Sequence, residues 1–395
     1  MKQVKEIERL WRKIIRNLHL YLGIVSGLVL FVVCLTGTIY TFRTEIEELL
    51  EPNKYRIQQI DETKQPISSL IGIVEQETKG KVGRVIVSDN QSRPYELNVK
   101  VGKEDKRGTN YLINPYTGEF LGSVKGPTSD FFMWIFKAHR WLLMDMDTGR
   151  PIVGIATLIF LFLCISGIAL WIPKKIKGWN SFKPGFKIMW KARWKRINHD
   201  LHSTLGFYTV FFLIVMSVTG LTWSFEWYNN GLHRILTGEK PTKRGGHGNQ
   251  ASNQQEVKAA ISYEDAIMLA QQHLGYTGKT IISKPQNGQY EITKYDKNRW
   301  NQDAADKVTL SAQTGEIVQV NLFSDLSLGE QISKQIKSIH MGTTFGMFSK
   351  IIYFISCLIA TTLPITGVFI WWNKLKKSKK NHRKRKKKIE DLATV

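Results

Sequence analysis

Histidine is the residue type whose spacing in this chain suggests chemistry. Nine histidines occur, and four of them recur at fixed offsets: His19 and His202 are 183 residues apart, and His139 and His340 are 201 apart. Each borders a long apolar stretch, where an ionisable side chain is costly and often functional. Two imidazoles on facing helices suit the axial positions of a haem iron, whereas zinc usually requires four ligands. The spacing therefore predicts two bis-histidine haem sites.

Apolar helices are the elements that must position these histidines. Four stretches of 23 to 26 residues contain no Asp, Glu, Lys or Arg, and the first covers residues 17–42. About 20 apolar residues span the hydrocarbon core of a bilayer. The sequence therefore predicts a multi-pass membrane protein embedded in the lipid bilayer. Its four expected spans are 19–42, 151–173, 201–225 and 351–373.

The net charge of +23 is concentrated in three short segments. Residues 1–16, 174–200 and 374–395 hold 26 Lys and Arg against 5 Asp and Glu, whereas the loops 43–150 and 226–350 hold 30 against 28. Lys and Arg are enriched at the cytoplasmic ends of membrane helices. We therefore expect both loops to be extracytoplasmic. The basic tail follows a span directly, which favours contact with anionic lipid and argues against a nucleic-acid partner. The expected cytoplasmic segments are 1–18, 174–200 and 374–395.

This topology sorts the histidines by depth. His19 and His202 begin the first and third spans, so they lie at the cytoplasmic edge and form an inner site. His139 and His340 precede the second and fourth spans, so they form an outer site on the opposite face. His199 lies three residues before His202 on a similar helix face and is an alternative inner ligand.

The chain is an internal repeat of span, loop and span. Gly23 and Gly206 lie one turn beyond His19 and His202, which leaves room for a flat macrocycle and equally suits close helix packing. Small-residue motifs recur within the spans: Thr36-Gly37 as Thr219-Gly220, and Ser166-Gly167 as Thr366-Gly367.

Each long loop has the pattern of a small α+β domain. Helix-like segments at 66–79 and 262–274 precede strand-like runs and a Thr-Gly-Glu turn, at residues 117–119 and 314–316. The predicted fold is an all-α four-helix transmembrane bundle with two extracytoplasmic α+β domains and an internal two-fold repeat.

Other residues near the spans suit ordinary structural roles. The tryptophans at the span ends are typical of an aromatic belt: Trp171, Trp223, Trp371 and Trp372. The cysteines are interpreted as small packing residues: Cys34, Cys164 and Cys357. Three further histidines are expected to be exposed to solvent: His247, His273 and His382. Two haems at opposite faces would form an electron conduit across the membrane. Nucleotide-binding motifs do not occur in the sequence, so the electrons would come from a separate donor.

The motifs around the histidines resemble the PepSY-associated transmembrane family, which includes iron-regulated ferric-siderophore reductases of the bacterial inner membrane. The long loops resemble PepSY modules. The matching motifs are R-x-x-H-x-x-x-G from Arg16 to Gly23, His139-Arg140, H-x-x-x-G from His202 to Gly206, and IHMGTTFG at residues 339–346.

The resemblance implies a ferrioxamine-reductase-like protein whose four spans hold two b-type haems. His19 and His202 would bind the inner haem, and His139 and His340 the outer one. Electrons would pass from a membrane quinol or a cytoplasmic reductase to a ferric siderophore outside. Two other functions remain open. One is a PepSY-domain protein that binds or regulates peptidases or peptides without being an enzyme. The other is a transporter or channel subunit, against which the lack of charged residues in the spans argues.

Overall fold

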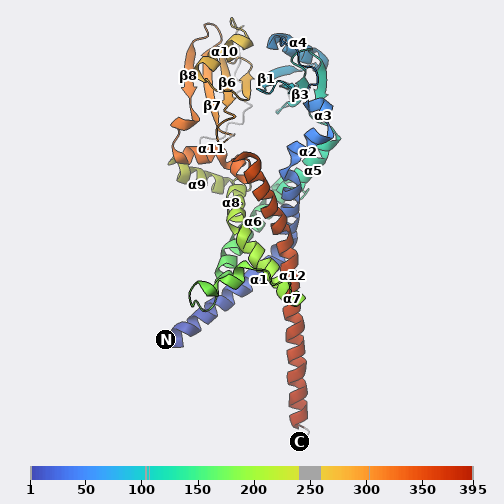
Figure 1. The fold of residues 1–395 in the computed structure, drawn as a ribbon, viewed down its shortest axis with the longest axis vertical. Helices are drawn as coiled ribbons and strands as arrows, with labels where there is room; N and C mark the ends of the chain where they lie inside the picture. The colour runs from blue at the N-terminus through green and yellow to red at the C-terminus, as the bar shows by residue number, and fades with distance from the viewer. Residues whose placement is uncertain (1, 103–104, 106, 240–258, 302, 394–395) are drawn as a thin grey trace.

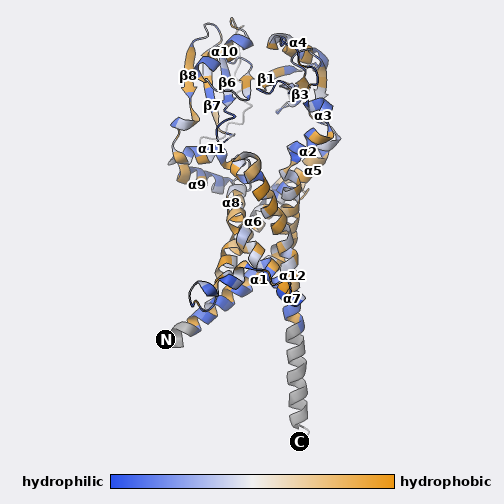
Figure 2. Ribbon diagram, in the orientation of Figure 1, coloured by the Kyte–Doolittle hydropathy of each residue, from blue (hydrophilic) through white to orange (hydrophobic). Residues whose placement is uncertain are grey.

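The computed structural model describes residues 2–102, 105, 107–239, 259–301 and 303–393, with side chains described between residues 6 and 376. It places a bundle of apolar helices at one end of the molecule and a β-sheet at the other (Figures 1 and 2). The predicted number of spans is confirmed. Within the described residues, four helical segments are long and apolar enough to cross a membrane: Glu6–Thr41, Met146–Trp171, Trp194–Trp223 and Gly346–Lys376.

The four spans pack into one bundle. Helices α1 and α8 both contact α6 and α12, so the two halves of the repeat interlock. Cys34 and Cys164 are buried together with Leu213 and Ala360 in this bundle, which agrees with packing roles for both cysteines. The helices are α1 (Lys2–Thr41), α6 (Met146–Trp171), α8 (Gly206–Gly220) and α12 (Gly346–Ala393), with α7 (Trp194–Asp200) and the π-helical turn η3 (Leu201–Leu205) directly before α8.

The two long loops share one sheet. All neighbouring strands are antiparallel, in the order β4-β3-β2-β1-β5-β6-β7-β8. The first loop supplies β1 (Lys81–Val87), β2 (Tyr95–Lys100), β3 (Thr109–Ile113) and β4 (Phe120–Ser123). The second supplies β5 (Thr280–Ser283), β6 (Gln289–Tyr295), β7 (Ala305–Ser311) and β8 (Ile317–Asn321).

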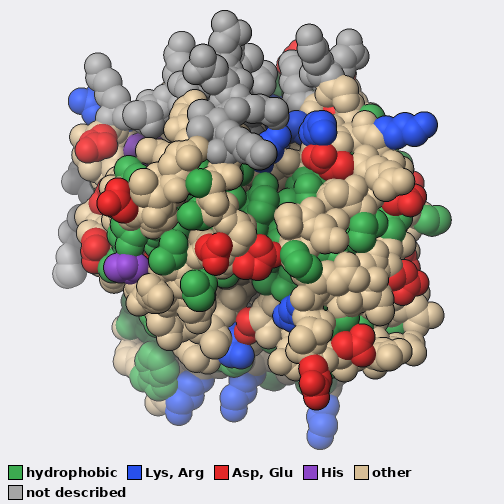
Figure 3. Space-filling view, turned by 90° about the horizontal axis from the view of Figure 1, so that it is seen from above, with side chains coloured by type: hydrophobic (Ala, Val, Ile, Leu, Met, Phe, Trp, Pro, Cys, Tyr) green, Lys and Arg blue, Asp and Glu red, His purple; other side chains and the backbone are tan. Residues whose placement is uncertain are grey.

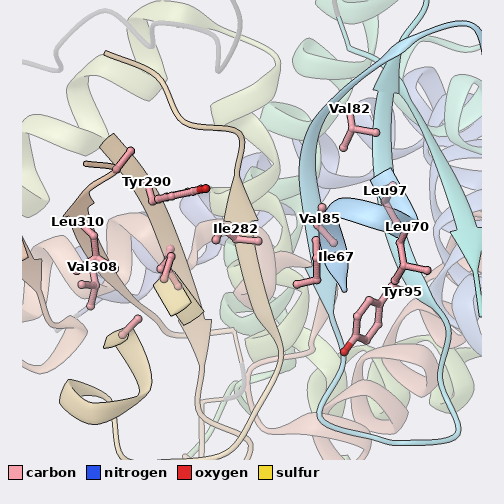
Figure 4. Close-up of a cluster of buried hydrophobic side chains, with 14 of the residues drawn as sticks. Ile67, Leu70, Val82, Val85, Tyr95, Leu97, Ile282, Tyr290, Val308 and Leu310 are labelled. Atoms are coloured by element: carbon pink, nitrogen blue, oxygen red, sulfur yellow. The ribbon is translucent and has the colours of Figure 1, made fainter. Parts of the chain in front are cut away.

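Strands β1 and β5 join the two loops at the centre of the sheet. Arg84 pairs with Ser283 and Val85 with Ile282, and Val85 and Ile282 are 1% and 0% exposed (Figure 4). One hydrophobic core therefore continues across the junction. The loops were predicted as two α+β domains, and the structure joins their strands into a single sheet.

Two amphipathic helices contact the sheet. Helix α4 (Ile67–Thr78) contacts β1, β2 and β3, helix α10 (Tyr263–His273) contacts β6 and β7, and the two helices contact each other. The predicted turns are present at Gly118 and Gly315, whose φ angles of 72° and 73° favour glycine. Seen from above, this end carries interspersed acidic and basic side chains (Figure 3), as expected from the near-neutral charge of the loops.

Short helices connect the sheet to the bundle. In the first half these are α2 (Arg43–Leu50), α3 (Pro52–Tyr55) and α5 (Pro127–Trp141). In the second half they are η4 (Leu221–Trp223), α9 (Glu226–Thr237), η5 (Phe323–Asp325) and α11 (Leu328–Met341). The connector at the other end of the bundle contains η1 (Trp179–Ser181) and η2 (Lys183–Phe186).

Candidate functional site

The structure brings the four predicted histidines together as two pairs. His19 of α1 and His202 of η3 have ring centroids 6.3 Å apart and planes inclined by 83°. The turn η3 directly follows α7, which lies at the end of the bundle with the chain termini (Figure 1), so we call these two histidines the tail-side pair. His139 of α5 and His340 of α11 have centroids 6.4 Å apart and planes inclined by 58°. They lie towards the sheet, and we call them the sheet-side pair.

Both separations suit one metal ion held between two imidazoles. Two nitrogen–metal bonds of about 2 Å, with the ring radii added, place the ring centres about 6.4 Å apart. Among the described residues, no group of three or more His, Cys, Asp or Glu side chains could hold a metal ion. The two-ligand geometry therefore fits a cofactor that brings its own equatorial ligands, as haem does.

Main-chain carbonyls fix the tautomer of the sheet-side pair. The Nδ1–H of His139 donates to the carbonyl oxygen of Val33 at 2.8 Å, and that of His340 donates to the carbonyl oxygen of Met216 at 3.0 Å. A carbonyl oxygen only accepts, so Nδ1 carries the proton and Nε2 keeps the lone pair that binds metal. Thr219 Oγ1 lies 3.0 Å from the Nδ1 of His340.

In the tail-side pair, side-chain hydroxyl groups accept the hydrogen bond from Nδ1–H. Ser166 Oγ lies 2.8 Å from the Nδ1 of His19, and Thr366 Oγ1 lies 2.9 Å from the Nδ1 of His202. Both hydroxyls donate to main-chain carbonyls of their own helix, so their oxygens accept from Nδ1–H. All four rings thus present Nε2 as the free nitrogen. Such partners fix ring orientation and raise ligand basicity.

A glycine lies against each ring. At Gly37 and Gly220 an added Cβ would lie 3.1 and 3.0 Å from the Cε1 atoms of His139 and His340. The tail-side contacts are looser: a Cβ would lie 3.6 Å from His19 at Gly167 and 3.5 Å from His202 at Gly367. The recurring unit at every site is therefore a hydroxyl residue followed by glycine. Sequence reasoning found these dipeptides as repeats but did not assign them to the histidines.

A cavity of about 590 Å³ lies beside the tail-side pair. Gly23 and Gly206 line it, as expected if small residues leave room for a flat ring. Trp171 and Trp371 line it as well, although both were assigned to an aromatic belt. The volume falls within the range of about 300–1,000 Å³ found for cofactor pockets. Its apolar wall suits a macrocycle, and four cations suit the carboxylates of haem: Arg12, Arg16, Lys174 and Lys374.

The alternative ligand His199 also lines this cavity, but it is His202 whose ring pairs with that of His19. The side chain of His199 is 59% exposed, and its Nδ1 lies 3.7 Å from a carboxylate oxygen of Asp200. The π-helical turn begins at Leu201, between the two histidines, and widens the helix there. His202 lies within this turn and meets His19. The geometry favours His202, as the repeat did.

An aromatic and cationic cluster adjoins the sheet-side pair. The ring of Trp223 lies 5.2 Å from that of His340, so this tryptophan also has a role beyond the expected belt. The guanidinium of Arg140 lies 6.0 Å from the Trp223 ring. Burial, and next the charge of Arg150, lower the pKa of Arg140.

Burial favours the neutral form of both rings of the sheet-side pair. Burial, and next the neighbouring His139, lower the pKa of His340 to about 3. Burial also lowers the pKa of His139. The neutral imidazole is the form that binds metal.

The remaining histidines lie apart from both pairs. His233 of α9 contacts Thr237 of the same helix, with 3.1 Å between its Nδ1 and the hydroxyl oxygen. His273 is exposed, as predicted. The predictions for His247 and His382 fall on side chains outside the described part of the structure.

Comparison with known proteins identifies a family whose model matches this chain. The model of the family described as the PepSY-associated TM region matches residues 16–374, which is most of the chain and includes all four histidines. No curated protein matches the sequence.

Proposed function

The chain belongs to the family of the PepSY-associated TM region, and from this premise we propose that it is a dihaem protein that carries electrons across a membrane. The observation that carries the proposal is the pair of two-histidine sites at opposite ends of one bundle, with centroids 6.3 and 6.4 Å apart. In all four rings Nδ1 is hydrogen-bonded and Nε2 is free for iron.

Bound haem would supply one-electron chemistry at each pair. The residues of this chain would hold and orient the two groups. His19 and His202 would ligate one iron within the apolar cavity, while Arg12 and Arg16 neutralise negative groups of the cofactor at its wall. His139 and His340 would ligate the other iron. Axial ligands and their surroundings tune haem potentials over about 0.8 V, and one charge crossing the membrane changes energy by about 2.3 kcal/mol per 100 mV.

The orientation of the chain in the membrane follows from the charge asymmetry. The basic segments adjoin the tail-side end, which the positive-inside rule assigns to the cytoplasm. The chain would then lie in the bacterial inner membrane, with both termini cytoplasmic and the sheet outside. Electrons would enter from quinol or a cytoplasmic reductase and leave at the sheet-side pair. The proposed acceptor is a ferric siderophore, whose reduction releases iron.

A dithionite-reduced minus oxidised spectrum tests the haem assignment. We expect the bands of a low-spin bis-histidine cytochrome, with two haems b per chain by pyridine haemochrome quantitation. Protein from a haem-replete host that is folded but contains no haem would contradict the proposal. Haem reoxidation by a ferric hydroxamate then tests the acceptor separately.

One observation favours a second candidate, in which the outer domains bind peptides or peptidases without catalysis. Strand β8 lies at an edge of the sheet and exposes Val318 and Val320, at 52% and 39%. An exposed edge strand can pair with an extended peptide. Folded, haem-free protein that binds a peptide through β8 would support this candidate.

A further inference from the structure

The two halves of the repeat pair their cations differently at the sheet-side end of the bundle. Arg150 of α6 and Lys350 of α12 occupy equivalent positions, because each is the fifth residue of its helix. Lys350 is buried, and its Nζ lies 2.6 and 2.7 Å from the two carboxylate oxygens of Glu45. The cation of the second half is thus neutralised from within the protein.

Arg150 has no such carboxylate. The residue equivalent to Glu45, 183 positions later, is Tyr228, which is uncharged at neutral pH. The Nε of Arg150 is buried without a hydrogen-bond acceptor, while Nη2 contacts only a weak one, the Met146 sulfur at 2.8 Å. Arg150 takes part in no ion pair among the described residues.

Arg140 adds a second cation without a carboxylate partner among the described residues. Its guanidinium lies 5.5, 5.7 and 6.0 Å from the ring centres of Phe136, Trp141 and Trp223. The equivalent residue in the second half is Met341, so only the first half has this charge. The end of α5 and the start of α6 bring the two arginines close together, because a Cβ added at Gly149, next to Arg150, would lie 2.0 Å from the carbonyl oxygen of Trp141, next to Arg140. Two partly buried like charges this close are costly unless an anion joins them.

We propose that Arg140 and Arg150 form a carboxylate-binding site beside the sheet-side histidine pair. Guanidinium groups bind carboxylates in a bidentate manner, and the three aromatic rings partly shield Arg140 from water. The carboxylate has two possible sources: the cofactor held by the histidine pair, or a ferric chelate that arrives from outside. The first source rests on the proposed function, and binding of a free carboxylate does not.

The first arm of the test uses the double variant Arg140→Gln/Arg150→Gln. Wild type and variant are each loaded with haem or with haem dimethyl ester, whose carboxylates are blocked. If the cofactor supplies the carboxylate, the variant releases the sheet-side haem to a scavenging apoprotein at least tenfold faster than wild type. With the dimethyl ester, wild type and variant release it equally fast.

The second arm uses citrate and ferric citrate. If an external chelate supplies the carboxylate, the double variant weakens citrate binding at least tenfold in calorimetry, in haem-loaded or haem-free protein. It also raises the KM for ferric citrate at least tenfold and leaves the KM for a neutral ferric hydroxamate unchanged. Protein that contains no haem contradicts the proposed function, and citrate binding then decides this proposal.

Two further variants keep the test decisive. Tyr228→Glu introduces a carboxylate at the position equivalent to Glu45 and keeps both arginines, so it should occupy the site and produce the same tenfold loss. Lys137→Gln removes an exposed cation from α5 and should change nothing. The proposal is overturned if haem release, citrate binding and the KM for ferric citrate all match wild type in the double variant and in Tyr228→Glu.

Discussion

The four histidines share a residue type but differ in what holds them. His139 and His340 donate to main-chain carbonyl oxygens, which do not depend on side-chain identity. His19 has the hydroxyl of Ser166 as its partner, whereas His202 has the hydroxyl of Thr366 together with the main chain of Leu363. Substitution of Ser166 should therefore alter the tail-side site more readily than a side-chain substitution alters the sheet-side one.

The pairing itself predicts a pattern of losses. If the protein binds the two proposed haems, His139→Ala and His340→Ala should each remove the same one, and His19→Ala and His202→Ala should each remove the other, because one axial ligand does not hold a bis-histidine haem. Haem content and the electron paramagnetic resonance signals of the two ferric haems measure this. His199→Ala serves as the matched control and should keep both. Loss of the tail-side haem in His139→Ala would refute the pairing.

The glycines beside the histidine rings give a finer prediction, because the distance between an added Cβ and the ring differs from site to site. In Gly220→Ala the new Cβ would lie 3.0 Å from His340, so the ring must shift. We expect roughly 10- to 100-fold weaker binding of the sheet-side haem, the range for outer-shell changes. In Gly367→Ala the new Cβ lies 3.5 Å from His202, an ordinary contact. Equal haem affinities in the two variants, measured by titration, would show that ring clearance does not matter.

Much of the candidate site was predictable at this scale. The offsets of 183 and 201 residues identified the four histidines, because a repeat places equivalent groups at equivalent depth. The partners on Nδ1 were not predictable. Val33 and Met216 contribute main-chain atoms, which residue type does not reveal, and the π-helical turn that contains His202 has no sequence signature.

At the scale of elements, the junction between β1 and β5 is the feature that sequence reasoning missed. Each loop contains its own helix and strands, and local patterns say nothing about which strand lies beside which. The pairing of Val85 with Ile282 joins residues that are far apart in the chain. Only the packing of two half-sheets against one another decides it.

Cross-linking tests the shared sheet. Arg84 and Ser283 are paired across the junction, and directly opposite residues of antiparallel strands lie close enough for a disulfide. In a background without the native cysteines, Arg84→Cys/Ser283→Cys should form a disulfide on mild oxidation. A pair with no partnership in the sheet, Arg84→Cys/Ser311→Cys, should not. Failure of the first pair to cross-link in folded protein would show that β1 and β5 are not paired and that the two loops form separate sheets.

A buried carboxylate in β7 predicts a pH-dependent stability. Burial alone would raise the pKa of Asp306, but hydrogen bonds from the Phe323 N–H, the Tyr276 hydroxyl and Arg299 lower it overall. The stabilisation is therefore complete above the unfolded pKa of about 3.9 and is lost as pH falls through the folded pKa. Asp306→Asn should cost about 1–3 kcal/mol at pH 7.

Thermal unfolding of the outer region, followed by protease resistance, measures this loss. The difference between Asp306→Asn and wild type should shrink as pH falls below about 4. The exposed Asp325→Asn is the control and should have little effect at any pH. A difference that grows in acid would mean that the Asp306 carboxylate is not stabilised as described.

At the scale of the whole molecule, charge and chemistry are arranged along one axis. The basic segments adjoin the tail-side pair, and the nearly neutral sheet adjoins the other pair. The four spans and their order followed directly from the charge-free stretches, because the bilayer imposes a length on each helix. The sequence did not predict that Lys350 has a carboxylate partner and Arg150 has none among the described residues, because this difference depends on contacts between the two halves.

Orientation in the membrane can be measured by thiol labelling. Asn90→Cys lies in the first long loop, and Lys177→Cys lies in the basic connector. In intact cells a membrane-impermeant maleimide should label the first site and should label the second only after permeabilisation. The reverse result would invert the topology and the proposed direction of electron flow.

The junction between β1 and β5 has a consequence for how the protein is made. The edge of β1 is translated roughly 190 residues before its neighbour β5, which at about 5–20 residues per second is about 10–40 s of synthesis. During that interval β1 has an unpaired edge. An unpaired edge strand can aggregate or pair with a neighbouring nascent chain. We therefore expect biogenesis to include a vulnerable stage, in which the yield of correctly assembled protein depends on how long the edge of β1 stays unpaired.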